Sequence, residues 1–237
     1  MLDAITATQV AMLQDQLRLQ SISQNVSNMQ TPGFKRQLID APSFDEQIQA
    51  EMGTVSQGML LSTQELQGTF VQSGRPSELA LSGEGYFEVQ TDEGVFYTRR
   101  GDFHVNEHGE LTTPTGAKLL GKGGVLRVDD NAYTIDTRGA LFVDNHQVDQ
   151  VNIVQFSNPA ALNYQGQGLY ESQEAPLPTG NATHVLQGFL EQSNVKSIDE
   201  MMEMVKTSRH FEASQRVMRA ADGLLSSAIK QLGEGNV

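Results

Sequence analysis

Residues 197–233 read SIDEMMEMVKTSRHFEASQRVMRAADGLLSSAIKQLG, and large apolar side chains recur in them at every seventh position. This period predicts one long amphipathic helix, which begins at a capping box formed by Ser197 and Glu200. A series of small side chains follows the large ones at a spacing of three, so a partner helix could approach this seam closely. The large positions are Met204, Phe211, Met218, Leu225 and Leu232. The small positions are Thr207, Ser214, Ala221 and Ala228, of which the last three complete the assembly interface expected on this helix.

The N-terminal segment, residues 2 to about 28, predicts a second helix, which must end by Thr31 because Pro32 and Gly33 follow. Its charged residues are only Asp3, Asp15 and Arg18, and such a loss of charge is typical of a helix in a protein contact. The interface positions expected on it are Ile5, Met12, Leu13, Leu17, Ile22 and Val26. Two interpretations stay open together: the two terminal helices pair with each other, or they pack against other subunits.

The middle of the chain differs from both ends. Residues 36–75 are rich in Gln, Ser, Thr and Gly and predict an extended connector. From there to residue 183, short apolar runs alternate with turn signals such as Asp92-Glu93-Gly94, which indicates antiparallel strands. The expected fold class is therefore α+β: a discontinuous helical coiled-coil module from both termini with an inserted antiparallel β domain. The expected parts are an N-terminal assembly helix (1–35), a connector (36–75), a β-rich domain (76–183) and a C-terminal assembly helix (184–237).

Composition excludes several functions. The net charge of −13 argues against binding to nucleic acid and against a polybasic membrane anchor. No apolar run approaches the ~20 residues of a bilayer-spanning helix, and the N-terminus lacks the pattern of a cleavable signal peptide. Cysteine is absent, which removes disulfides and thiol nucleophiles.

Chemistry-bearing motifs are scarce. His104 and His108 lie four residues apart beside Glu107, a possible metal fragment, but the spacing straddles an expected hairpin turn. A metal-dependent hydrolase that uses these histidines is one alternative. We expect instead no enzyme activity, no catalytic or metal-binding residues and no cofactor.

Four stretches together resemble the bacterial flagellar rod and hook family of axial proteins. They are Asn25-Val26-Ser27-Asn28-Met29-Gln30-Thr31-Pro32-Gly33-Phe34-Lys35, Leu79 to Val89, Tyr97 to Phe103, and Gly188-Phe189-Leu190-Glu191-Gln192-Ser193-Asn194-Val195. The motif residues carried by the resemblance are Asn25, Asn28, Thr31, Pro32, Gly33, Phe34, Glu191, Ser193, Asn194 and Val195. Arg209-His210-Phe211-Glu212, followed by Arg216-Val217, is more similar to the proximal than to the distal rod protein.

The resemblance implies a structural subunit of the flagellar basal-body rod, outside the cytoplasmic membrane and periplasmic in a Gram-negative cell. It implies helical polymerisation through the terminal helices, transmission of torque from motor to hook, and export by the flagellar type III apparatus. Its partners would be copies of itself and other rod proteins, with no nucleic acid and no membrane insertion. The alternatives are a distal rod protein, another axial hook or rod protein, or a β module that binds a scaffold protein.

Overall fold

The computed structural model describes residues 2–40, 60–128, 132–159, 162–180 and 182–234. Contacts divide the chain into two units. The helical unit comprises Met1–Val26, Gln37–Leu61 and Lys196–Val237, and the β unit comprises Ser27–Arg36 and Ser62–Val195. The fold class is α+β, as expected, with helices from both ends of the chain and antiparallel strands between them. The four-part division stays a prediction, and residues 41–59 of the expected connector lie outside the described residues.

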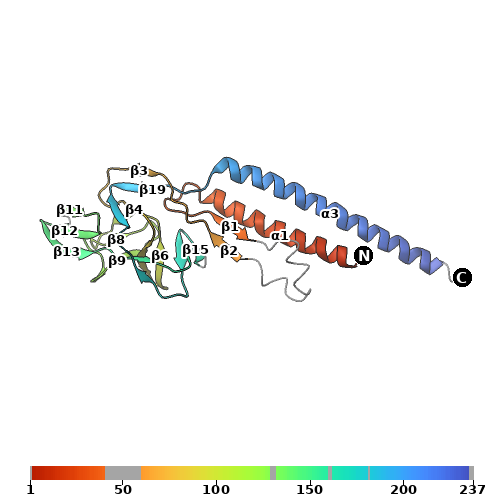
Figure 1. Ribbon diagram of the computed structural model, residues 1–237, viewed down its shortest axis with the longest axis horizontal. Coiled ribbons are helices and arrows are strands. Elements are labelled where there is room, and N and C mark those ends of the chain that lie inside the picture. The colour runs from red at the N-terminus through yellow and green to blue at the C-terminus, as the bar shows by residue number, and fades with distance from the viewer. Residues whose placement is uncertain (1, 41–59, 129–131, 160–161, 181, 235–237) are drawn as a thin grey trace. The chain divides into compact units, whose positions relative to one another are not determined.

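Helix α1 spans Leu2–Ser27 and helix α3 spans Ser197–Glu234, and the two run side by side in the helical unit (Figure 1). A turn ends α1, in which the Thr31 amide donates to the Asn28 carbonyl at 3.0 Å. Gly33 follows with a φ of 67°, a left-handed conformation that glycine adopts readily. Among the described residues, no helix combines the length and the apolar content that crossing a membrane requires.

The strands lie between the two helices in the sequence, from Gln37 to Glu191. The first ten are β1 (Gln37–Asp40), β2 (Leu60–Thr63), β3 (Phe70–Gln72), β4 (Leu79–Ser82), β5 (Tyr86–Thr91), β6 (Gly94–Thr98), β7 (His104–Val105), β8 (Leu111–Thr112), β9 (Lys118–Gly121) and β10 (Gly124–Val125). The others are β11 (Tyr133–Ile135), β12 (Ala140–Val143), β13 (His146–Gln150), β14 (Ile153–Gln155), β15 (Asn163–Gly166), β16 (Leu169–Glu171), β17 (Leu177–Pro178), β18 (His184–Gln187) and β19 (Phe189–Glu191). Strands β18 and β19 therefore precede α3 within the segment 184–237.

The main sheet of the β unit has the order β15-β16-β6-β5-β9-β8-β7, with β10 beside β9 and β14 between β5 and β17. A smaller sheet has the order β11-β12-β13. Two further pairs join segments that lie far apart in the sequence: β18 pairs with β4, and β19 pairs with β3. These two pairs bring the chain that leaves the β unit back beside the chain that enters it.

The hydrophobic core lies in the β unit. One cluster of buried side chains is built around Leu79, Phe87, Leu119 and Leu141, each with no exposed surface. A second cluster is aromatic, with Tyr86 and Tyr170 at its centre. Alternating apolar residues on short antiparallel strands bury one face in this way, so the β unit has a core of its own.

Candidate assembly interface

Two hydrogen bonds define how α1 and α3 pair within the helical unit. His210 Nδ1 lies 2.6 Å from Asp15 Oδ2, and Asn25 Nδ2 donates to Glu200 Oε2 at 3.3 Å. These contacts lie ten residues apart on each helix and in opposite directions. The helices are therefore antiparallel and keep one register over about three turns.

The expected interface positions of α3 lie on its less exposed side. Met204, Phe211, Met218, Ser214 and Ala221 are all partly buried. Thr207, on the same seam, is 3% exposed. Val205 and Val217, which are next to Met204 and Met218 in the sequence, are 51% and 58% exposed. The side chains of Leu225, Ala228 and Leu232 lie outside the described part of the structure. Burial along α3 thus follows a seven-residue repeat, the period on which the interface was predicted.

The expected positions of α1 differ in exposure. Ile5, Met12, Leu17 and Val26 are partly buried, and Ile22 is 3% exposed. Leu13 differs from them, because it is 52% exposed although Leu17, one turn later on the same face, is partly buried. Five of the six predicted side chains are therefore at least partly covered, and Leu13 is exposed.

The helical unit has little hydrophobic core among its described side chains. Within that set, Ile22 is the only hydrophobic residue of α1 or α3 that is fully buried. Large hydrophobic side chains of the helices that remain exposed are Leu13, Ile198, Met201, Met202, Val205, Val217 and Leu224. Six of these seven side chains belong to α3.

The motif residue Asn25 fixes the end of α1 to the chain that follows it. Its side-chain amide accepts from the Gln37 backbone N–H at 2.8 Å and donates to the Gln37 carbonyl at 2.9 Å. Ser21 Oγ donates to the same carbonyl at 3.0 Å. Asn25 is 1% exposed. Its side-chain amide makes with the Gln37 backbone the two hydrogen bonds that a neighbouring strand would otherwise make. Only a side chain with both a donor and an acceptor can make this pair.

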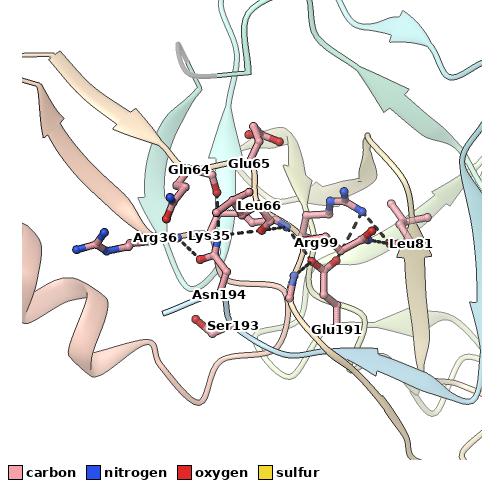
Figure 2. A network of polar contacts seen from close by, with 12 residues as sticks. Lys35, Arg36, Gln64, Glu65, Leu66, Leu81, Arg99, Glu191, Ser193 and Asn194 are labelled. Carbon is pink, nitrogen blue, oxygen red and sulfur yellow. Dashed lines mark hydrogen bonds and ion pairs between the residues drawn. The ribbon is translucent and has the colours of Figure 1, made fainter. Parts of the chain in front are cut away.

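The remaining motif residues meet in the β unit, where residues 31–36 lie beside residues 191–195 (Figure 2). We call this contact the motif junction. The Gly33 amide donates to the Glu191 carbonyl at 2.7 Å, and the Asn194 amide donates to the Phe34 carbonyl at 3.3 Å. Asn194 Oδ1 accepts from the Arg36 amide at 2.7 Å. Two sequence motifs that are far apart in the chain are therefore one structural element.

The side chain of Asn194 also binds a third segment of the β unit. Its Nδ2 donates to the Gln64 and Leu66 carbonyls, each at 2.9 Å (Figure 2). Ser193 Oγ accepts from the Val195 amide at 3.2 Å and shapes the turn before α3. The asparagine thus holds together three backbone segments, which explains why an amide side chain occupies this position.

Charged side chains lie at the centre of the motif junction. Lys35 Nζ lies 2.7 Å from Glu191 Oε1, and Arg99 Nη1 lies 3.6 Å from Glu191 Oε2. All three side chains are at most 2% exposed. Lys35 Nζ also donates to the Leu66 carbonyl at 3.0 Å, and Glu191 Oε1 accepts from the Gly68 amide at 2.9 Å. Burial lowers the pKa of Lys35, while the neighbouring Glu191 carboxylate opposes that shift.

Glycine is required where the backbones of the motif junction approach each other. A Cβ at Gly33 would lie 2.1 Å from the Arg99 carbonyl oxygen, and a Cβ at Gly68 would lie 1.8 Å from the Gln192 carbonyl oxygen. Both distances are far below a van der Waals contact. The resemblance named Gly33 as a motif residue and included Lys35 and Arg99 in its stretches without a role for either, and Gly68 fell in the expected connector. Lys35 and Gly68 each bind Glu191 across more than a hundred residues of sequence.

The first motif is completed by aromatic packing. The ring of Phe34, which has no exposed surface, meets Tyr164 edge-on at a centroid distance of 5.4 Å. Asn28 Oδ1 accepts from Thr31 Oγ1 at 3.2 Å and from the Tyr164 hydroxyl at 3.4 Å. Pro32 follows Thr31 in the turn that ends α1 and is partly buried. These residues therefore stabilise the path of the chain and offer no reactive group to solvent.

The two histidines considered as metal ligands are both exposed, at and beside a hairpin turn. His104 is in β7 and its Nε2 lies 3.3 Å from Thr112 Oγ1, and His108 is in the turn that leads to β8. Within the described residues, no group of three or more His, Cys, Asp or Glu side chains could hold a metal ion.

Two families match separate parts of the chain. Residues 186–231 match the family described as "Flagellar basal body rod FlgEFG protein C-terminal", and residues 80–153 match "Flagellar hook protein FlgE/F/G D1 domain". The first match contains Glu191, Asn194 and most of α3. The second contains most of the main sheet.

Relatives cover nearly the whole chain. The flagellar basal-body rod protein FlgG of Bacillus subtilis (strain 168) is 27% identical over 245 residues, covering 90% of this chain and 93% of that protein. FlgG of Borreliella burgdorferi is 28% identical and covers 96% of this chain and 98% of its own length. The rod protein FlgF of Caulobacter vibrioides is 28% identical, and the match covers 92% of this chain and 93% of that protein. The choice between a proximal and a distal rod protein stays a prediction. The chain belongs to the flagellar basal-body rod protein family, as a structural subunit of the basal body.

Proposed function

We propose that copies of this chain stack helically through α1 and α3 and that the stack transmits torque from motor to hook. One observation supports this most directly: in the described part of the helical unit, Ile22 is the only fully buried hydrophobic side chain of the two helices. A helix pair with so small a core gains little free energy from folding alone. Packing against further copies would cover the exposed apolar side chains of both helices.

The two helices would form a coiled coil whose seam carries the predicted interface residues. A contact between unlike surfaces of successive copies builds an open helical stack instead of a closed ring. Ordering the helices would then accompany assembly, because fixing each backbone residue costs about 1–2 kcal/mol and needs buried area to offset it. A chain whose terminal helices are not yet ordered before assembly would also be narrow enough to pass through the export apparatus.

Further partners follow from the same proposal. They are other rod proteins at the two ends of the stack and the flagellar type III export apparatus. The chain would act as a structural part without catalysis or cofactor. The four methionines of α3 could fit neighbours of different sequence, because their side chains are flexible and polarisable.

Sedimentation velocity and circular dichroism on the full-length protein test this proposal together. Wild-type protein should grow into large species with rising concentration, and its helix signal at 222 nm should rise in parallel. Phe211→Ala, on the partly buried side of α3, should weaken assembly, by about 3–5 kcal/mol if the ring is fully buried in the stack. Full helicity in a verified monomer would contradict ordering on assembly, and wild-type protein that stays monomeric at all concentrations would contradict the stacking itself.

A further inference from the structure

A pocket of about 590 Å³ opens on the main sheet of the β unit. Residues of the β5–β6 turn, of the segment that leads into β9 and of the β15–β16 turn line it. Its volume falls within the range of about 300–1,000 Å³ that is usual for binding sites. Phe96 and Leu169 give the pocket an apolar part, and Asp92, Glu93 and Gln167 give it polar groups. The pocket therefore combines an aromatic ring with two carboxylates and an amide.

The two carboxylates of the pocket carry charge that their own chain does not neutralise. Asp92 and Glu93 are exposed on the β5–β6 turn, and within the described part of the chain neither forms an ion pair. Lys118 is the one basic residue of the lining, and its Nζ lies 3.0 Å from Glu110, which is not part of the lining. The pocket is therefore suited to a positively charged group.

The backbone around the pocket is fixed in an unusual conformation. Gln167 has a φ of 56°, a left-handed conformation that residues other than glycine seldom adopt, and Arg100 Nη1 donates to its carbonyl at 3.0 Å. On the opposite rim, the Glu93 amide donates to Thr91 Oγ1 at 3.2 Å. Strained residues of this kind are concentrated at binding sites. Gln167 thus supports the assignment of the pocket as a contact site.

An arginine side chain matches the chemistry of the pocket. A guanidinium group is planar and presents several donors, so it can contact carboxylates and stack on an aromatic ring at the same time. A lysine ammonium is a compact charge without a flat face. A neutral ligand would leave the charges of Asp92 and Glu93 without a partner.

Arg138 is the arginine of the β unit that its own chain engages least. Its side chain is 84% exposed, and its ion pair with Asp136 is long, at 3.8 Å. The turn that carries it is well fixed, because Asp136 Oδ1 accepts from the Arg138 and Ala140 amides at 2.9 and 2.8 Å. The other arginines of the unit have closer carboxylate partners or belong to the motif junction: Arg75, Arg99, Arg100, Arg127 and Arg36.

Arg138 and the pocket lie at opposite ends of strand β9. Lys118, the first residue of β9, lines the pocket. Gly121, the last, forms a bridge with Val151, whose amide donates to the Gly139 carbonyl at 2.8 Å. Figure 1 likewise shows the sheet β11-β12-β13 and strand β15 on opposite sides of the β unit. The two features are therefore unlike surfaces, and a contact between them joins one copy head to tail with the next.

We propose that Arg138 of one copy enters the pocket of the next copy and binds Asp92 and Glu93 there. The arginines of α1 and α3 belong to the helices that the proposed stack already joins. This inference rests on that stack and adds to it a contact between β units. The chain carries a net charge of −13, so an attractive contact of opposite charges also selects one orientation among copies that otherwise repel each other.

Charge reversal on each side of the contact tests the inference by sedimentation velocity. The pocket variant carries Asp92→Lys and Glu93→Lys, and the second variant carries Arg138→Glu. Each should need at least about tenfold more protein to assemble, because like charges would then meet. A combined variant with all three substitutions should assemble within about threefold of the wild-type concentration, because opposite charges meet again. Urea midpoints of dilute, unassembled protein should match the wild type, which separates a lost contact from a lost fold.

A matched control makes the same change of net charge elsewhere. Glu107→Lys with Glu174→Lys alters two exposed positions of the β unit outside the pocket, and this variant should assemble at the wild-type concentration. A control as impaired as the pocket variant would overturn the inference, because net charge would then explain the loss.

Two further outcomes would overturn the inference and leave the stacking of the helices intact. One is normal assembly by the pocket variant or by Arg138→Glu. The other is a combined variant that assembles as poorly as the two variants it combines, since the two sides would then not face each other. Wild-type protein that never assembles would overturn this inference and the proposed stacking together.

Discussion

Removing the negative charge of the motif junction should destabilise the β unit more than removing one of its positive charges. Lys35, Arg99 and Glu191 are buried together, and both cations contact the one Glu191 carboxylate. Glu191→Gln leaves both cations without the carboxylate that contacts them, in an environment that water does not reach, and Glu65 then remains as the nearby carboxylate that acts on Lys35. Breaking a buried ion pair by deleting one partner typically costs about 3–5 kcal/mol, and we expect the upper part of this range here.

Lys35→Met should cost less, although it removes the shorter of the two contacts. The remaining Arg99 and Glu191 form a neutral pair at 3.6 Å, and Glu191 Oε1 keeps the Gly68 amide at 2.9 Å. The substitution also removes a buried ammonium group whose pKa is lowered by desolvation. We therefore expect a loss of about 1–3 kcal/mol, the range for a hydrogen bond lost from a buried charged group.

Urea unfolding followed by tyrosine fluorescence measures this difference. The five tyrosines all lie in residues 86–170, inside the β unit, and the chain has no tryptophan, so the signal reports on that unit alone. Arg138→Met is the matched control, because the Arg138 side chain is 84% exposed and lies 3.8 Å from Asp136, so its loss should cost less than about 1 kcal/mol. A loss for Lys35→Met equal to or greater than that for Glu191→Gln would refute the charge balance argued here.

Three further results are expected. Gly33→Ala should unfold the β unit at a lower urea concentration than the wild type, because its Cβ would lie 2.1 Å from the Arg99 carbonyl and its φ is 67°; unchanged midpoints would contradict the close approach. Asn25→Ala should lower the helix signal at 222 nm but leave tyrosine fluorescence unchanged, because the amide binds Gln37 and Glu200 within the helical unit. Hydrogen bonds and ion pairs from Asn106, Lys118 and Arg127 lower the pKa of Glu110 from 4.5 to about 2, so its contribution to stability is present above pH 4.5 and is lost as the pH falls toward 2. Glu110→Gln should remove this part of the acid sensitivity, which urea midpoints at pH 5 and pH 3 would measure.

Local signals in the sequence predicted the helices well. The sequence predicts the start of α3 at Ser197, and the helix spans Ser197–Glu234. The predicted capping box stays a prediction: the Glu200 amide donates to the Lys196 carbonyl at 3.1 Å, and the Glu200 carboxylate accepts from Asn25 at 3.3 Å. Pro32 and Gly33 place the end of α1 before Thr31, and the helix ends at Ser27. Both signals act within a few residues, because capping and steric exclusion depend on neighbouring backbone atoms.

Pairings between distant segments could not be predicted in this way. Strand β4 pairs with β18 about a hundred residues later, and Lys35 binds Glu191 across 156 residues. No periodicity within either segment indicates its partner, because the contact depends on how the intervening strands fold. The resemblance named Asn25, Gly33, Glu191 and Asn194 as motif residues, but only the structure gives each of them a physical role.

The motif junction also bears on the pairing of the helices. Asn25 and Glu200 make their contact across 175 residues of chain. In the β unit, Phe34 and Asn194 are already hydrogen-bonded, nine residues after Asn25 and six residues before Glu200. Once the β unit has folded, the loop that helix pairing must close shortens to about 15 residues. By the logarithmic dependence of closure entropy on loop length, this lowers the cost of pairing by about 2 kcal/mol. A helical unit with almost no described core of its own therefore gains from the β unit a contribution that local helix propensity cannot supply.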